Sequence, residues 1–346
     1  MLLIDATNLG GGGGNNLLAY LLDQLSDLHF VALVSTRSGI LPSGRIEVMQ
    51  ATSPLGSERQ KSLKLAVEKY SPDRLLCFGN LPPRERLNVS EVITYFHNAH
   101  LIEPLDRSCH YSWKNRIRYS ILRRAVRKFA SNTDSWVFQS SYIRDSFVEE
   151  YSVAIESSYV FPFFDEPKLR SFCGQSSSLR EREGFVYVSD DSAHKNHERL
   201  LDAWIILSEK YNLNPELHLT VPFDNKKLTK RIQMLCRMGI RITNHGLISW
   251  PDAIRLTSHC KFVIFPSLLE TLGLGMVEGC LLGAKVIATN NPALKDIIVP
   301  SATMNPLDAS SIAEASAMAC CTPIPDSRII LRNQIDPLIS LLFSTK

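Results

Sequence analysis

Short runs of β-branched, aromatic and other apolar residues recur along the chain, and helix-length amphipathic stretches separate them. In the first half the runs lie at residues 2–5, 30–35, 75–78, 92–96 and 136–139. In the second half they lie at residues 185–188, 217–221, 262–265 and 285–288. Strands that alternate with helices at this spacing are typical of parallel, doubly wound α/β sheets. The pattern therefore predicts two such sheets.

The two halves are separated by residues that interrupt regular structure. A Tyr-Val-Phe-Pro sequence at 159–162 is followed by Pro167 and by the polar stretch 174–178. Proline and clustered serines are typical of a domain crossing and a surface loop, and 346 residues exceed what one core usually organises. We expect an N-terminal domain over 1–161, a C-terminal domain over 162–328, and a helix over 329–346 that packs back on the first domain.

Composition restricts the class of protein. Hydrophobic residues make up 45% and charged residues 21% of the chain, as in an ordinary globular protein. The start of the chain has no basic leader, and no apolar run reaches about 18 residues, so we expect a cytoplasmic protein. The eight cysteines, Cys109 and Cys173 among them, form no Cys-x-x-Cys pair. They are interpreted as reduced thiols, with no metal site.

The positive charge is concentrated in one place. Seven basic residues and no acidic residue lie between Lys114 and Lys128, and without those seven the formal net charge of +3 would become −4. A small total charge does not indicate a nucleic-acid partner, but a local basic segment indicates an anionic contact.

A glycine run at residues 10–14 lies between a predicted strand and a predicted helix. Ordering several glycines is entropically costly, so such runs usually mark close approach of a ligand or of another backbone segment. At a helix N-terminus, free N–H groups favour phosphate, which makes this run a candidate phosphate contact. The run matches neither a P-loop nor the dinucleotide fingerprint, and a flexible solvent turn is the alternative.

A polar loop that contains His194 and Lys195 follows the predicted strand 185–188. Ligands of open α/β sheets bind outside the carboxyl ends of the strands, where a lysine can hold a phosphate leaving group. A cation at the start of a helix opposes the helix dipole. This conflict favours a negatively charged partner over a merely solvated lysine.

Two glutamates flank a glycine-containing turn after the strand 262–265. Glu270 is expected in the loop and Glu278 about one turn into the next helix, with Gly273 and Gly275 between them. Carboxylates accept hydrogen bonds from neighbouring hydroxyls, which a sugar or a ribose presents in pairs. A single glutamate of this kind could be a solvated surface acid, but the paired arrangement favours a ligand site.

Together these segments resemble a known family. The order of a glycine-rich first loop, His-Lys-Asn-His at 194–197, Asn-His-Gly at 244–246 and Pro-Ser-x-x-Glu-x-x-Gly-Leu-x-x-x-Glu at 266–278 is similar to family 4 glycosyltransferases. Residues 283–296 continue the similarity, which is good in the C-terminal half and loose in the N-terminal half. The resemblance implies the GT-B fold, in which two Rossmann-like domains with doubly wound parallel sheets face a central cleft.

The resemblance also implies roles for residues in a retaining, metal-independent transfer that needs no cofactor. Glu278 would hold the ribose of a nucleotide sugar, Glu270 and the Leu274–Gly275 backbone would contact the donor sugar and phosphate, and Lys195, with Gly12 or Gly13, would neutralise the departing diphosphate. Lys195 and Glu270 are thus the catalytic candidates. The further candidates for donor binding are His194, Arg199, Gly246 and Thr271.

Three positions depart from the family pattern. Asp190 occupies the place of a frequent arginine, and Arg199, one turn after Lys195, could compensate for the lost charge. Gly275 stands where proline is common, and Lys285 replaces the proline of a Gly-x-Pro sequence. An acid cannot stabilise a diphosphate, so Asp190 leaves open a degenerate protein that binds nucleotide or acts as a scaffold.

The N-terminal half offers two acceptor-side hypotheses. His97 follows a predicted strand and could orient or deprotonate an acceptor hydroxyl, or it could be structural. The basic segment reads as a helix whose apolar arc includes Ile121, Leu122 and Val126. It could contact anionic lipid and a lipid-diphosphate-linked acceptor, or it could simply be a core helix with a solvated face. The patch residues are Arg116, Arg123, Arg124, Arg127 and Lys128.

The sequence thus predicts a glycosyltransferase that moves a sugar from a nucleotide sugar to a glycan or lipid-linked acceptor. Bacterial cell-surface polysaccharide, such as the O-antigen of lipopolysaccharide or a capsule, is the expected product, made peripherally at the inner face of the plasma membrane. A nucleotide-sugar epimerase or a phosphorylase on the same architecture is the enzymatic alternative, because fold alone does not determine function.

Overall fold

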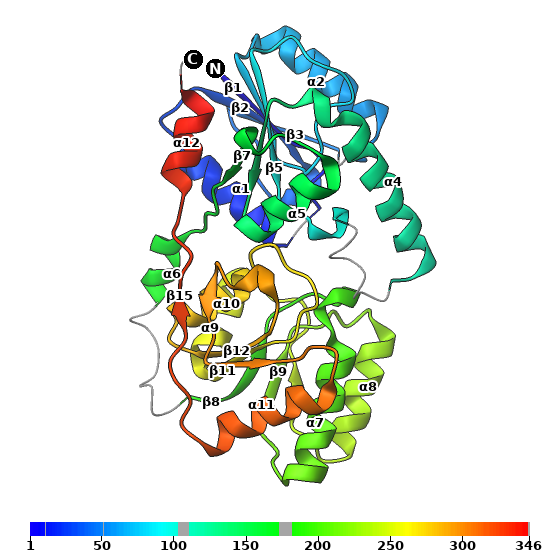
Figure 1. Cartoon of the computed structure of the whole chain (residues 1–346), viewed down its shortest axis with the longest axis vertical. Helices are drawn as coiled ribbons and strands as arrows, with labels where there is room; N and C mark the ends of the chain where they lie inside the picture. Colours follow the sequence, from blue (N-terminus) through cyan, green and yellow to red (C-terminus); the bar gives the residue numbers. More distant parts are fainter. Residues whose placement is uncertain (11, 51, 103–110, 173–181, 345–346) are drawn as a thin grey trace. The chain divides into compact units, whose positions relative to one another are not determined.

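The chain forms two compact units in the computed structural model (Figure 1). The structure describes residues 1–346 except 11, 51, 103–110, 173–181 and 345–346. Gly11, the polar stretch 174–178, Cys109 and Cys173 therefore lie outside the described residues. The N-terminal unit comprises the described residues of Met1–Arg107, Tyr111–Asp165 and Arg332–Lys346, and the C-terminal unit those of Glu166–Leu331.

A seven-stranded parallel sheet forms the centre of the N-terminal unit, in the order β3-β2-β1-β4-β5-β6-β7. Its strands are β1 (Leu2–Ala6), β2 (Phe30–Ser35), β3 (Ile46–Met49), β4 (Arg74–Cys77), β5 (Glu91–Phe96), β6 (Ser135–Phe138) and β7 (Ser158–Val160). Every residue of β1, β2, β4, β5 and β6 is buried. Both sheet faces are therefore covered, as the continuous apolar runs predict.

Helices of the N-terminal unit cover this sheet. They are α1 (Gly13–Gln24), α2 (Ser57–Tyr70), α4 (Trp113–Phe129), α5 (Ser141–Tyr151) and α12 (Ile335–Phe343). Short 3₁₀ turns lie at Thr36–Ser38, Ala99–Leu101, Ala130–Asn132 and Ile155–Ser157. Helix α2 illustrates the packing, because Leu63 and Val67 lie in one buried cluster with Leu3 and Leu75 of the sheet.

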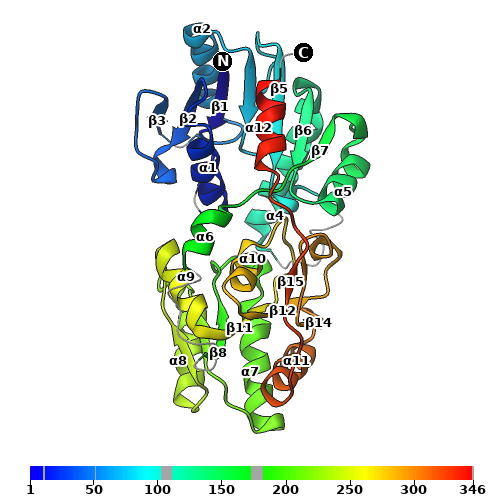
Figure 2. The ribbon, with the colours of Figure 1, turned by 90° about the vertical axis from the view of Figure 1, so that its left-hand side faces the viewer.

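The C-terminal helix α12 belongs to the N-terminal unit and lies along its strands (Figure 2). The backbone N–H of Gln334 donates to the carbonyl of Pro162 at 2.7 Å, and Arg74 donates to the carbonyl of Leu341 at 3.2 Å. The expected helix over 329–346 is shorter than predicted, because Ile329 pairs with Ile298 in a strand. Pro337 falls in the first turn of α12, where a missing N–H breaks no helical hydrogen bond.

A second parallel sheet, in the order β10-β9-β8-β11-β12-β14, forms the centre of the C-terminal unit. Its strands are β8 (Glu183–Tyr187), β9 (Leu217–Leu219), β10 (Ile242–Asn244), β11 (Cys260–Phe265), β12 (Lys285–Thr289) and β14 (Ala302–Met304). A small antiparallel ribbon joins β13 (Ile298–Val299) to β15 (Arg328–Ile329).

The helices of this unit are α6 (Glu166–Phe172), α7 (His197–Tyr211), α8 (Lys226–Arg237), α9 (Trp250–His259), α10 (Leu274–Leu281) and α11 (Ala309–Cys321). Two 3₁₀ turns lie at Ala193–Lys195 and Pro292–Leu294. Within the described ranges, none of the helices is both long and apolar enough to cross a bilayer.

The two predicted parallel sheets are confirmed, and each predicted strand overlaps an observed one. The prediction missed β3, β7, β10, β13, β14 and β15, which are two to four residues long. Strands this short carry too few alternating positions to stand out from turns. Tertiary pairing with a longer neighbour, not local sequence, makes them strands.

Candidate functional site

Two neighbouring strands of the C-terminal unit carry the predicted site. Strands β8 and β11 pair in parallel, with Val186 opposite Val263, so that their carboxyl ends lie at the same sheet edge. The loop after β8 contains His194 and Lys195, and the loop after β11 contains Glu270. Ligands of open α/β sheets bind at such an edge.

Hydrogen bonds fasten these two loops to each other. The N–H of Leu268 donates to the His194 carbonyl at 2.8 Å. The Nδ2 atom of Asn196 donates to the carbonyls of Pro266 at 3.1 Å and Pro306 at 2.7 Å. Asn196 has a φ of +63°, a left-handed conformation that asparagine tolerates. The asparagine of the His-Lys-Asn-His sequence is therefore a structural clamp, a role that its sequence context did not indicate.

The clamp brings Lys195 and Glu270 together. Lysine Nζ lies 2.6 Å from glutamate Oε1, and only 17% and 12% of the respective side chains is exposed. Burial works against the charged form of Glu270, but the charges of Lys195 and His194 hold its pKa below the usual value. Glu270 is therefore a carboxylate near neutral pH, and it holds the Lys195 side chain where a phosphate charge could develop.

Glu278 has the opposite electrostatics. It lies in α10 beside Val186, Val263 and Phe265, and this burial raises the pKa of its carboxyl. The indole Nε1 of Trp250 donates to its Oε1 at 2.8 Å, which opposes the rise. The two predicted glutamates are thus a salt-bridged carboxylate and a carboxyl in a largely apolar setting.

The two glycines of this segment differ in whether their surroundings would admit a side chain. Gly273 has a φ of +62°, and a Cβ there would lie 2.4 Å from Met276. Gly275 lies within the first turn of α10, and a Cβ there would make only an ordinary contact with Phe265, at 3.5 Å. No side chain caps α10. The N–H groups of Leu274 and Gly275 in its first turn are therefore suited to bind an anion. Thr271 precedes them and is partly exposed.

The remaining residues of this unit that were predicted to bind or surround the sugar donor contact other parts of the protein. Arg199 donates to Oδ1 of Asn196 at 2.9 Å, so its first role is to brace the clamp. Gly246 has a φ of +69° and lies beneath the ring of Phe223, which a Cβ would approach to 2.3 Å. Asp190 is exposed, and although desolvation opposes its ionisation, Lys195 and Ser192 keep the pKa of its carboxyl low.

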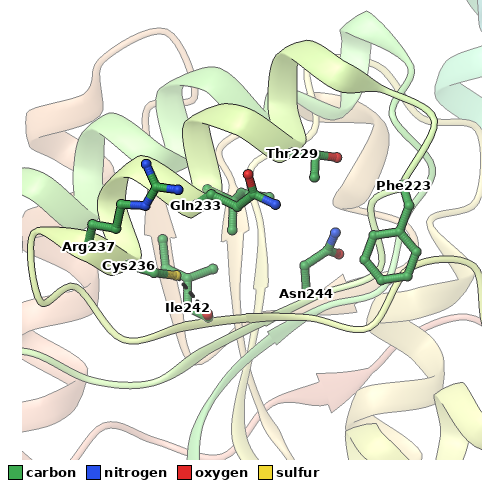
Figure 3. A pocket seen from close by; sticks show the side chains of 8 residues that line it. Phe223, Thr229, Gln233, Cys236, Arg237, Ile242 and Asn244 are labelled. Atoms are coloured by element: carbon green, nitrogen blue, oxygen red, sulfur yellow. Dashed lines mark hydrogen bonds between the residues drawn. The ribbon is translucent and has the colours of Figure 1, made fainter.

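A separate groove of about 480 Å³ lies between α8 and the edge strand β10. Figure 3 shows its wall of helical side chains facing Ile242 and Asn244. The lining residues are Phe223, Thr229, Ile232, Gln233, Cys236, Arg237, Ile242 and Asn244. None of these is a residue predicted to bind the donor.

In the N-terminal unit, His97 lies against the glycine run. A Cβ added to Gly14 would come within 3.2 Å of the imidazole Cε1. The Nε2 atom of His97 donates to the carbonyl of Phe78 at 3.0 Å, and burial lowers the pKa of the imidazole. Burial therefore favours the neutral ring, and the bond to the Phe78 carbonyl favours the tautomer that carries its proton on Nε2. Gly12, with a φ of +69°, precedes the first residue of α1, Gly13.

The basic helix α4 does not expose the set of residues that the sequence predicted. Ile121 was expected on the buried arc, but 45% of it is exposed, as are 51% of Ile117 and 68% of Trp113. Arg123 donates twice to the carbonyl of His100, at 3.1 and 2.8 Å, and Arg127 pairs with Glu150 at 2.7 Å. Arg123 is therefore partly buried and occupied within the fold, whereas Arg127 is ion-paired but 57% exposed. The exposed cations of α4 are Lys114, Arg116, Arg118, Arg124, Arg127 and Lys128.

The geometry of the C-terminal unit agrees with a comparison against protein families. Residues 175–324 match the model described as glycosyl transferases group 1. The chain is a glycosyltransferase, and its residues 175–324 are the segment that matches this family. Its reaction is the transfer of a sugar from a nucleotide sugar. A comparison with curated protein sequences found no match.

The glycosyltransferase also resembles solved structures. HepE of Anabaena in complex with UDP and glucose has a TM-score of 0.64 and 18% identity, over 92% of this chain and 89% of HepE. Sucrose-phosphate synthase of Thermosynechococcus elongatus has a TM-score of 0.68 and 16% identity, over 92% and 89%. WaaG, a glycosyltransferase involved in lipopolysaccharide biosynthesis, has a TM-score of 0.69 and 14% identity, over 93% and 91%. The predicted GT-B fold is confirmed.

Two features of the glycosyltransferase escaped the sequence prediction. Trp250 is 28 positions before Glu278, and nothing in the local sequence links the two. In the N-terminal unit, Asp5 and Arg59 form a buried ion pair at 2.7 Å. No regular sequence spacing links an acid in one strand to an arginine far along the chain. Only the structure therefore identifies these two residues as partners.

Proposed function

We propose that this glycosyltransferase transfers its sugar with retention of configuration and without a metal ion. The nucleotide sugar binds at the carboxyl edge of the C-terminal sheet, with Glu278 at the ribose and Glu270 at the transferred sugar. Lys195 contacts the diphosphate. The acceptor is a glycan or a lipid-diphosphate-linked glycan of a bacterial cell-surface polysaccharide, such as an O-antigen or a capsule.

The Lys195–Glu270 pair carries this proposal. In the reaction the bond between the anomeric carbon and the diphosphate oxygen breaks, and the acceptor oxygen forms a bond on the same face of the sugar. The acceptor proton leaves to the departing diphosphate or to a base, for which Nδ1 of His97 is our candidate. A fixed, partly buried ammonium stabilises the charge that grows on the leaving oxygen. One of its three N–H groups already serves Glu270.

The direct test is to incubate the protein with UDP-, GDP- and ADP-sugars, with and without a lipid-linked acceptor, and to measure nucleoside diphosphate release. We expect acceptor-dependent release from one donor. Interconversion of the free nucleotide sugar would instead support an epimerase. Binding without turnover would support the degenerate scaffold that Asp190 suggested.

Replacing Glu278 with glutamine should have opposite effects on binding and on stability. Loss of the charged acceptor at the ribose should weaken nucleoside diphosphate binding about tenfold. Because burial favours the protonated carboxyl in the folded state, Glu278 contributes less to stability as the pH rises through its raised pKa. The variant should therefore melt at a higher temperature than the wild type at pH 7.

Calorimetric titration and thermal melts at pH 7 and pH 4 measure both effects. The stability difference should shrink at the lower pH, where the wild-type carboxyl is protonated. In the wild type, nucleotide affinity should fall as the pH drops through the pKa of Glu278, and this dependence should be absent in Glu278→Gln. A variant that binds nucleotide like the wild type would contradict the ribose assignment.

The exposed face of α4 supports the membrane part of the proposal. Trp113, Ile117 and Ile121 recur every four residues and form one exposed apolar stripe. Exposed arginines, among them Arg116 and Arg118, flank it. An apolar stripe bordered by cations suits the interface of an anionic bilayer, the surface on which a lipid-linked acceptor is found.

Liposome flotation tests this surface. We expect the wild type to float with vesicles of anionic phospholipid at low salt and to lose most of that binding when Arg116, Arg118 and Arg124 become glutamine. The matched control replaces Lys226, Lys230 and Arg237, three exposed cations of α8, with glutamine. Equal flotation of both triple variants would remove α4 from the proposal.

A further inference from the structure

The Glu278 carboxyl has few polar neighbours. It lines a small cavity with four apolar side chains, those of Val186, Val188, Val263 and Phe265, with Gly275 and with the polar side chain of Thr257. The cavity volume of about 10 Å³ holds a single water molecule at most. The indole Nε1 of Trp250 donates a hydrogen bond to the Oε1 atom of this carboxyl at 2.8 Å. This directional bond fixes which oxygen of the carboxyl faces Trp250.

Trp250 is itself held in place by its position at the start of α9 and by another helix, α6. It is the first residue of α9, whose N-cap Ser249 accepts a hydrogen bond from Asp252. The ring of Phe172 in α6 meets the indole edge-on at 5.8 Å between centroids. The Nζ atom of Lys168, also in α6, lies over the indole face at 4.8 Å. The indole N–H is therefore aimed at α10 by contacts that do not involve Glu278.

We propose that Trp250 is the positioning residue for Glu278: its indole N–H fixes one carboxylate oxygen so that the other is presented to the ribose hydroxyls. This inference rests on the proposed function. It adds a specificity element, because a carboxylate held in one orientation accepts from a pair of hydroxyls better than one that must be ordered on binding. A nucleotide without those hydroxyls gains nothing from the arrangement.

The test compares Trp250→Phe with the wild type. Phenylalanine keeps an aromatic ring against Phe172 and Lys168 but cannot donate to Glu278. The probes are UDP, GDP and ADP, each beside its dideoxy counterpart that lacks both ribose hydroxyls, and the base that binds the wild type most tightly is used. We expect Trp250→Phe to weaken ribonucleotide binding about tenfold and to leave the dideoxy affinity within twofold.

Two controls separate positioning from a general structural effect. Trp204→Phe removes another indole hydrogen bond of the same unit, from Nε1 to the Pro215 carbonyl at 3.0 Å, and should leave both affinities unchanged. In a Glu278→Ala background, Trp250→Phe should cause no further loss, because the two changes remove one function.

The outcomes distinguish the inference from the function on which it rests. Suppose that Glu278→Ala weakens binding of the ribonucleotide but not of the dideoxynucleotide. If Trp250→Phe then weakens binding of both probes equally, or of neither, the positioning role is wrong. If Glu278→Ala itself fails to discriminate, or if none of the three nucleotides binds the wild type, the ribose assignment fails and the positioning role with it.

Discussion

Replacing Lys195 with methionine should lower kcat for sugar transfer by about 10²- to 10³-fold, the usual effect of removing one preorganised charge from a transition state. Methionine keeps the length and much of the volume of the side chain but carries no charge. The effect should fall mainly on kcat, because the ammonium stabilises charge that develops as the diphosphate leaves. Steady-state release of nucleoside diphosphate measures it.

The loss of Lys195 should also change Glu270. Without the ammonium 2.6 Å away, burial dominates and the pKa of Glu270 should rise. The matched control is Lys227→Met, which breaks an ion pair with Glu198 at 2.7 Å through a lysine that is 83% exposed. We expect that control to retain wild-type kcat. A Lys195→Met enzyme within about threefold of the wild type would mean that the ammonium does not act on the leaving group.

The largest expected effect on stability is at Arg59. Substitution by methionine should cost about 3–5 kcal/mol of unfolding free energy, because it leaves the charge of Asp5 buried without its partner. Arg59 is 2% exposed and Asp5 is fully buried. The same guanidinium donates to the carbonyls of Leu81 at 2.7 Å and Pro82 at 3.1 Å, so it also holds the loop after β4.

Urea unfolding, with hydrogen exchange of the β1 and β4 amides to localise the loss, measures this effect. The double variant Asp5→Asn with Arg59→Met removes both charges and should recover part of the stability. The exposed pair of Lys64 with Glu85, at 2.6 Å, offers a control, and Lys64→Met should change stability by less than about 1 kcal/mol. A single Arg59→Met variant as stable as that control would show that Asp5 is not held as a buried charge.

The structure explains why Lys285 stands where the family often has a proline. It replaces a frequent proline, and its side chain donates to the carbonyl of Ile324 and lies 3.3 Å from Asp326. Beside it, Ser327 accepts from the N–H groups of Val286 at 2.8 Å and Ser301 at 3.1 Å. Lys285 thus helps to secure the segment that leads from α11 to β15, which the sequence pattern could not reveal.

The sequence determined the class of fold and the main candidates of the site. Continuous apolar runs identified the buried strands of both sheets, because a strand covered on both faces has no polar positions. Loops at the carboxyl ends of parallel strands identified Lys195, Glu270 and Glu278, because that edge is shared by neighbouring strands. The same reasoning did not identify the residues that contact these three side chains.

Tertiary structure decided what each candidate contacts. Local periodicity placed Ile121 on the buried arc of α4, but whether an apolar residue is covered depends on what packs against the helix at that turn. Asn196 became a clamp and Trp250 the donor to Glu278 because segments far apart in sequence meet at the sheet edge. Short-range patterns record the faces of helices and strands, whereas ion pairs such as Asp5 with Arg59 form between distant segments and leave no periodic trace in the sequence.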